Sequence, residues 1–113
     1  PNLIGIIYNH DGTKAWVSDR VKDFYGYDPV EYLGISGWTI IHPEDLAAVT
    51  KAYQTAFAAK KAGVSDPGFR IEARVLCKNK EYLHVVTHAQ MIGKYIVATE
   101  APINDAVKAA SSA

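Results

Sequence analysis

The chain has 113 residues, which fits a single domain, and 49% of them are hydrophobic, enough to form a buried core. Its 12 basic and 12 acidic side chains give a formal net charge of zero, which argues against a nucleic-acid or anionic-membrane partner. The single cysteine, Cys77, excludes an internal disulfide, and no apolar stretch is long enough to cross a membrane. A cytoplasmic protein is the simplest expectation, and an N-terminal Pro1 with Met91 as the only methionine predicts a piece of a longer chain.

The first quarter of the chain predicts a hairpin followed by a short helix. Residues 3–8 are apolar and end at Asn9-His10-Asp11-Gly12, where Asp-Gly is a strong turn signal, and residues 14–17 supply the second strand. A helix over residues 20–25 then ends at Gly26, a residue type that adopts the left-handed conformation at low cost.

Two helix starts follow in quick succession. In Asp28-Pro29-Val30-Glu31, Asp28 is expected to cap, Pro29 to occupy the first helical position and Glu31 to complete a capping box, with Gly34 ending the helix. His42-Pro43-Glu44-Asp45 repeats the arrangement, so His42 is interpreted as the cap of a long helix beginning at Pro43 and not as a ligand or a base. One apolar stripe at helical spacing supports this helix: Leu46, Val49, Tyr53, Ala56 and Phe57.

After residue 65 the hydrophobic period changes to two. Residues 69–75 alternate apolar and charged, residues 78–80 form a turn in which Asn79 can adopt the left-handed conformation, and strands over 82–91 and 95–99 follow. Hairpins on both sides of a helical middle predict an α+β fold, an antiparallel sheet with helices on one face. The domain is expected to span residues 1–103, with 104–113 as the start of a connector helix or a frayed tail.

Three stretches in this order resemble a PAS domain of the subgroup common in bacterial sensor proteins: FYGYDPVEYLG (24–34), W-x-x-x-HPEDL (38–46) and FRIEARVLCKNKEYLHVVTHAQMI (69–92). The resemblance covers nearly the whole chain, although the family usually has Asp-Gly in the turn where this chain has Lys78-Asn79-Lys80. It implies a five-stranded antiparallel sheet facing several short helices and one long helix, with a cavity between them. It also implies a sensor module that often pairs as a dimer and regulates an effector in the same chain.

No cofactor or metal is predicted. Some PAS domains resemble haemoproteins with an axial histidine in the long helix, but residues 44–62 contain no histidine. Cys77 lacks the Gly-x-Asn-Cys-Arg-Phe-Leu-Gln motif of flavin-binding light sensors. On a strand, His84 and His88 share a face about 13 Å apart at roughly 3.3 Å per residue, too far to bind one ion as a pair.

Two groups of side chains are candidate sites. An inner group is expected to line a ligand pocket, although a filled core is an equally simple interpretation of its aromatic members. The inner group is Trp38, Ile41, Val49, Tyr53, Phe57, Ile71, Ala73, Thr87, Ala89 and Thr99. An outer group on the long strand is expected to meet a partner subunit, and it is Tyr82, His84, Val86 and His88.

The functional prediction is therefore a signal-sensing module of a bacterial signalling protein, most simply a histidine kinase. A small ligand or a partner would act through the sheet and residues from Ile103 onward on a C-terminal effector. A ligand-free dimerisation module is one alternative, and a haem-binding gas sensor is a weaker one. A small enzyme is another, but it requires an acid or base in the pocket, and the inner positions named above contain none.

Overall fold

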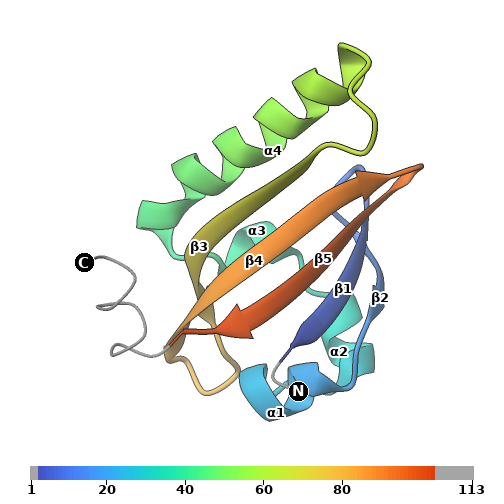
Figure 1. Ribbon diagram of the computed structural model, residues 1–113. Helices are drawn as coiled ribbons and strands as arrows, with labels where there is room; N and C mark the ends of the chain where they lie inside the picture. The colour runs from blue at the N-terminus through green and yellow to red at the C-terminus, as the bar shows by residue number, and fades with distance from the viewer. Residues whose placement is uncertain (1–2, 104–113) are drawn as a thin grey trace.

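A computed structural model of the chain describes residues 3–103, so the expected connector at 104–113 lies outside the described residues. The chain forms a five-stranded antiparallel sheet in the order β2-β1-β5-β4-β3, which confirms the predicted α+β fold (Figure 1). The strands are β1 (Ile4–Asn9), β2 (Lys14–Val17), β3 (Gly68–Leu76), β4 (Tyr82–Ile92) and β5 (Tyr95–Pro102). Between β2 and β3 lie α1 (Arg20–Tyr25), α2 (Pro29–Leu33), α3 (Gly37–Ile40), a 3-10 turn at Pro43–Asp45 and α4 (Leu46–Lys61).

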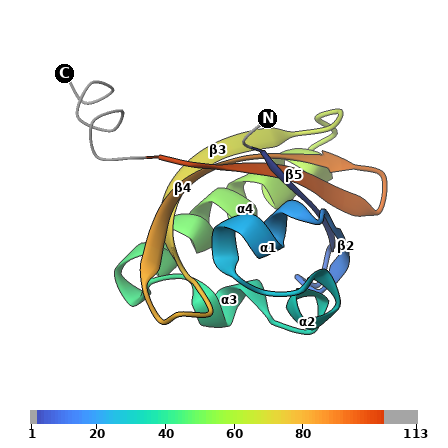
Figure 2. The same ribbon diagram turned by 90° about the horizontal axis from the view of Figure 1, so that it is seen from below.

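The helices all lie on one side of the sheet, which curves over them (Figure 2). The strand register decides which side chains face the helices, because directly paired residues share a face. Ile6 pairs with Ala98, which also pairs with Ala89, and all three side chains are buried on the helical side. Each residue that follows these in its strand points to the opposite, outer face.

The first hairpin and the end of α1 form as the sequence predicts. Asp11 accepts a hydrogen bond from the backbone N–H of Thr13 at 2.9 Å, and Gly12 has φ of 90°, a left-handed value that suits glycine. Gly26 follows α1 with φ of 82°, and its N–H donates to the carbonyl of Lys22. The tight turn and the helix end are therefore both glycine positions in the physical sense.

The predicted capping box at α2 is wrong. Asp28 does precede Pro29 at the start of the helix, but its side chain makes no capping hydrogen bond. Asp28 instead accepts from the ammonium of Lys22 at 2.7 Å, and Glu31 accepts from that of Lys78 at 2.9 Å. Lysines distant in sequence compete for both carboxylates, which local pattern alone does not reveal.

The cap at His42 is confirmed, since its Nδ1 accepts the backbone N–H of Glu44 at 3.0 Å. The long helix begins slightly later than predicted, because the chain passes through one 3-10 turn before α4 starts at Leu46. α3, a single turn at Gly37–Ile40, was not predicted. In the β3–β4 turn, Lys80 and not Asn79 takes the left-handed conformation, with φ of 72°. Asn79 instead supports the turn by accepting the N–H of Glu81 at 3.0 Å.

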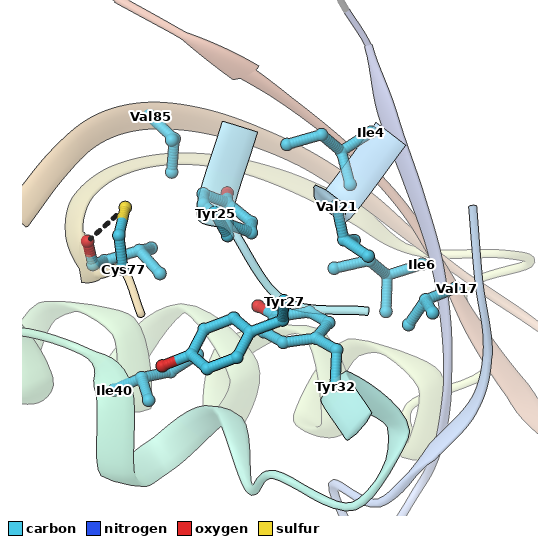
Figure 3. Packing of buried hydrophobic residues seen from close by; sticks show 11 residues of the cluster. Ile4, Ile6, Val17, Val21, Tyr25, Tyr27, Tyr32, Ile40, Cys77 and Val85 are labelled. Atoms are coloured by element: carbon cyan, nitrogen blue, oxygen red, sulfur yellow. Dashed lines mark hydrogen bonds between the residues drawn. The ribbon is translucent and has the colours of Figure 1, made fainter. Parts of the chain in front are cut away.

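Buried side chains form two core clusters. The larger one lies under α1, α2 and the outer strands, and Figure 3 shows the rings of Tyr27 and Tyr32 stacked within it, with centroids 5.4 Å apart. The smaller cluster joins α4 to the hairpin end of β4 and β5, around Ala56 and Met91. Tyr8 packs against both clusters. The space between the two clusters is the cavity described next.

Candidate functional site: a cavity between α4 and the sheet

A cavity of about 130 Å³ lies between the two core clusters, with α3 and α4 on one side and the sheet on the other. Eight of the ten predicted inner residues line it: Trp38, Ile41, Val49, Tyr53, Phe57, Ile71, Ala73 and Thr87. Its aromatic walls come from separate elements, and Tyr53 of α4 contacts both Trp38 and Phe69 with ring centroids 5.4 and 4.8 Å away. A volume of this size compares with the roughly 150 Å³ cavity that accommodates one benzene ring.

The other two predicted inner residues lie elsewhere. Ala89 faces the helices but packs inside the smaller core cluster, where no space remains beside it. Thr99 is exposed on the outer face, because Ile96, Ala98 and Glu100 are the buried positions of β5. The predicted phase of β5 was therefore wrong by one residue, and a shift of one residue exchanges the two faces of a strand.

The same one-residue error hid the most polar residue of the cavity, Glu100. Its side chain is buried, lines the cavity, and accepts a 2.6 Å hydrogen bond from the hydroxyl of Tyr25. Burial raises the pKa of the Glu100 carboxyl, while hydrogen bonds from Tyr25 and Thr87 and the charge of Lys14 oppose that rise. The alternation of charged and apolar residues that revealed β3 gives no warning in β5, where Glu100 follows a run of uncharged residues.

Lys14 is a second buried charged residue near the cavity that the sequence analysis missed. Its ammonium donates to the backbone carbonyl of Ile35 and lies 4.2 Å from the ring centroid of Tyr32. Burial lowers the pKa of Lys14 to about 8, against the raising effect of Glu100. Lys14 is not among the residues that line the cavity, so its charge acts on Glu100 from behind the wall.

The rim of the cavity brings the β1–β2 turn against two helices. A Cβ on Gly12 would lie 3.0 Å from Nε1 of Trp38 in α3, so the absence of a side chain there permits this contact. His10 of the same turn meets Phe57 of α4 edge to face, with ring centroids 5.4 Å apart. Trp38 is 39% exposed, which places its indole at the boundary between cavity and solvent.

An ion pair ties the start of α4 to β3. Asp45 accepts from the backbone N–H of Arg74 at 2.8 Å and from two nitrogens of its guanidinium at 3.0 and 2.9 Å. These hydrogen bonds lower the pKa of Asp45 to about 2, despite an opposing effect of partial burial. The N–H of His42 also donates to the carbonyl of Arg74 at 2.9 Å, so the helix start is fixed to the strand at two points.

The predicted outer group occupies the expected face of β4. Tyr82 and His88 are exposed, and His84 and Val86 are partly buried. Tyr82 packs on the ring of His42, with centroids 4.7 Å apart, and Nε2 of His84 lies 3.5 Å from a carboxylate oxygen of Glu72. Within residues 3–103, no three His, Cys, Asp or Glu side chains lie close enough together to hold a metal ion.

The sequence analysis overlooked a second apolar region of the outer face. Trp16, Ile7 and Val97 are direct register partners across β2, β1 and β5, so their side chains form one band. Trp16 is 50% and Val97 37% exposed. The signal was present in the sequence as the residues that alternate with the buried Ile4, Ile6 and Ile96.

The fold and the cavity agree with comparison to known proteins. The family profile described as "PAS fold" matches residues 14–96, and the chain belongs to this family of signal-sensing modules. Two solved structures of the PAS-B domain of Drosophila melanogaster Cycle are similar, the wild type with bound ethylene glycol and the W398A variant with bound glycerol. Each has a TM-score of 0.77 and 19% identity, and covers 88% of this chain and 99% of the other. A comparison with curated protein sequences finds no match.

PAS domains are generally sensory and interaction modules and not catalysts, and they commonly mediate protein interaction and dimerisation. The family assignment thus confirms that the domain is not an enzyme, even though the cavity contains a buried carboxyl. Across residues 3–103, none of the helices combines the length and the hydropathy that crossing a membrane requires.

Proposed function

We propose that this domain is the sensory input of a larger bacterial signalling protein, most simply a histidine kinase, and that it binds a small molecule in the cavity between α4 and the sheet. The effector would follow the described chain beyond Ile103. Membership in the PAS family supports the sensory role, and an aromatic cavity with a few polar groups supports a ligand.

The observation that carries the proposal is the position of Glu100. This residue lines the cavity and lies on β5, the last strand, which ends at Pro102. The next residue, Ile103, donates its N–H to the carbonyl of His84 in β4 at 2.8 Å. A ligand that contacts Glu100 therefore touches the strand that leads out of the fold. It can shift an equilibrium between two states only if it binds them with unequal affinity.

The test is binding of toluene, a small apolar probe, followed by thermal unfolding and by amide chemical shifts. A site that binds only the folded chain stabilises it by about 2.7 kcal/mol at a hundred times Kd. We expect a raised Tm and shifted amide signals both at the cavity and at Ile103. Ala73→Leu should fill the cavity and abolish both effects, whereas Ala15→Leu, at an exposed position of β2, should leave them intact. An unchanged Tm, or shifts at the surface only, would refute cavity binding.

A second candidate function, a ligand-free dimerisation module, is favoured by the apolar outer face. The band of Trp16, Ile7 and Val97 would pack against a second copy together with the predicted outer group on β4. Sedimentation equilibrium tests it with Val97→Glu, which should yield monomers. Val30→Glu is the matched control, since Val30 is 84% exposed on α2. A monomeric wild-type chain would exclude this candidate for the isolated domain.

A further inference from the structure

The charges that line the cavity all have one sign. Apart from His10, its ionisable lining residues are two carboxyl groups, Asp11 at the rim and Glu100 in the interior, together with tyrosines. Neither lysine nor arginine is among the described lining residues, and Lys14 is held behind the wall by the carbonyl of Ile35. A negatively charged ligand would therefore meet only like charge along the walls, whereas a positively charged one would meet a carboxyl group at each end.

The aromatic walls favour the same sign of charge. Tyr8, Tyr53, Phe57 and Phe69 line the cavity around the position of Glu100, and Trp38 stands at the rim. Ring faces attract cations within about 6 Å of their centroids, and the attraction reaches about 2 kcal/mol when the cation is desolvated. An aromatic enclosure with one buried carboxyl group is thus complementary to an ammonium group attached to an apolar body.

The polar wall is already arranged to orient such a group. Tyr25 donates to one carboxyl oxygen of Glu100 at 2.6 Å and is not itself a lining residue, so it fixes the carboxyl from behind. Thr87, the register partner of Glu100 on β4, places its hydroxyl beside it in the cavity lining. A carboxyl held in this way needs little reorganisation when a donor approaches from the cavity.

We propose that the cavity recognises a small organic amine, with an apolar body about the size of a single ring and an ammonium group directed at Glu100. This inference rests on the proposed function, because it specifies the ligand of the same cavity. Size limits the ligand: a volume of about 130 Å³ admits one ring, and the open rim at Trp38 leaves room for a short substituent.

The test measures Kd for four compounds of matched shape on the 113-residue chain by calorimetry: benzylamine, benzyl alcohol, toluene and benzoate. We expect benzylamine to bind about tenfold more tightly than benzyl alcohol and toluene, and benzoate to bind more weakly than toluene. Glu100→Gln keeps the shape of the side chain and removes its charge, so it should bring benzylamine down to the level of benzyl alcohol. Glu44→Gln removes one negative charge from a side chain that is 75% exposed and should change none of the four values.

The outcomes separate the two proposals. If toluene binds but benzylamine binds no more tightly than benzyl alcohol, the amine inference is wrong and cavity binding stands. If benzoate equals benzylamine, the charge argument is wrong. If none of the four compounds binds the wild-type chain, the proposed function fails and the amine inference fails with it. The wild-type series decides these cases even if Glu100→Gln does not fold.

Discussion

Tyr25 and Glu100, 75 residues apart in sequence, are joined by a buried hydrogen bond of 2.6 Å between a phenol hydroxyl and a carboxyl oxygen. The bond links α1, the first helix, to β5, the last strand, beside the cavity. Both groups are buried, so each would lose a partner that water cannot replace. The pair therefore serves the fold and orients the polar wall of the candidate site.

Tyr25→Phe is expected to destabilise the chain by about 1.5–3 kcal/mol, because it leaves the Glu100 carboxyl without its donor while retaining the ring. Urea unfolding monitored by circular dichroism measures the loss. Tyr82→Phe is the matched control, since it removes the same hydroxyl from a side chain that is 45% exposed, and its effect should be close to zero. Equal effects of the two substitutions would mean that the Tyr25–Glu100 bond contributes nothing to stability.

Glu100 should also give the free energy of unfolding a characteristic pH dependence. Burial raises the folded pKa of Glu100 above its ordinary value of 4.5, against the effects of Tyr25, Thr87 and Lys14. The folded chain then binds more protons than the unfolded chain above pH 4.5, so its stability falls as pH rises toward the folded pKa. The lowered pKa of Lys14, about 8, has an effect of opposite sign, but only at more alkaline pH.

Glu100→Gln should flatten this slope when urea unfolding is compared at a series of pH values from 4.5 to about 7. Glu44→Gln should retain it, because the substituted side chain is 75% exposed. A slope that persists in Glu100→Gln would assign the pH dependence to another group.

The sequence predicted the elements well because their signals are local. The Asp11-Gly12 turn, the left-handed glycine after α1 and the alternating strand of residues 69–75 each depend on neighbours along the chain. Eight of the ten inner residues also followed from strand and helix periodicity. Lys22 and Lys78, which take the carboxylates of the predicted capping box, are contacts made only by the folded chain.

The polar part of the site could not be obtained in the same way. β5 has few charged residues to mark its wet face, so the interpretation of Thr99 and Glu100 depended on the assumed phase alone. A buried glutamate also contradicts the usual rule that carboxylates face water, and only its hydrogen-bond partners make burial affordable. Those partners, Tyr25 and Thr87, come from other elements and become visible only when the sheet register is known.

The ion pair between Asp45 and Arg74 should stabilise the junction of α4 and β3 at neutral pH. Asp45→Asn is expected to cost on the order of 1 kcal/mol, near the upper end for partly solvated pairs, since solvent screens the charges. Because the folded pKa of Asp45 is lowered to about 2 from 3.8, this stability is present above pH 3.8 and is lost as pH falls through about 2.

Urea unfolding at neutral and at acid pH tests this prediction, together with an NMR titration of the Asp45 carboxyl carbon. Glu44→Gln is the matched control, because Glu44 meets the same guanidinium at 3.3 Å but is 75% exposed, and its effect should be much smaller. A titration midpoint for Asp45 at its ordinary value would show that the hydrogen bonds from Arg74 do not persist in solution.

The contact between Gly12 and Trp38 can be separated from the backbone preference of the turn by comparing two glycines. Gly12 and Gly93 both have positive φ, 90° and 58°, but a Cβ would meet Trp38 at 3.0 Å in the first case and no atom within 4 Å in the second. Each alanine substitution should cost about 1–2 kcal/mol for the left-handed conformation. Only Gly12→Ala should, in addition, displace the indole at the rim of the cavity.

Fluorescence in a Trp16→Phe background reports on that displacement, because the chain has two tryptophans and Trp38 is then the only one that emits. We expect Gly12→Ala to shift the Trp38 emission to longer wavelength, since the indole moves from the rim toward water, and to lose more stability than Gly93→Ala. Weaker toluene binding should accompany the shift, because Trp38 forms part of the cavity wall. If both alanine variants lose equal stability and leave the emission unchanged, the turn does not hold Trp38 in place, and the rim must be shaped by α4 alone.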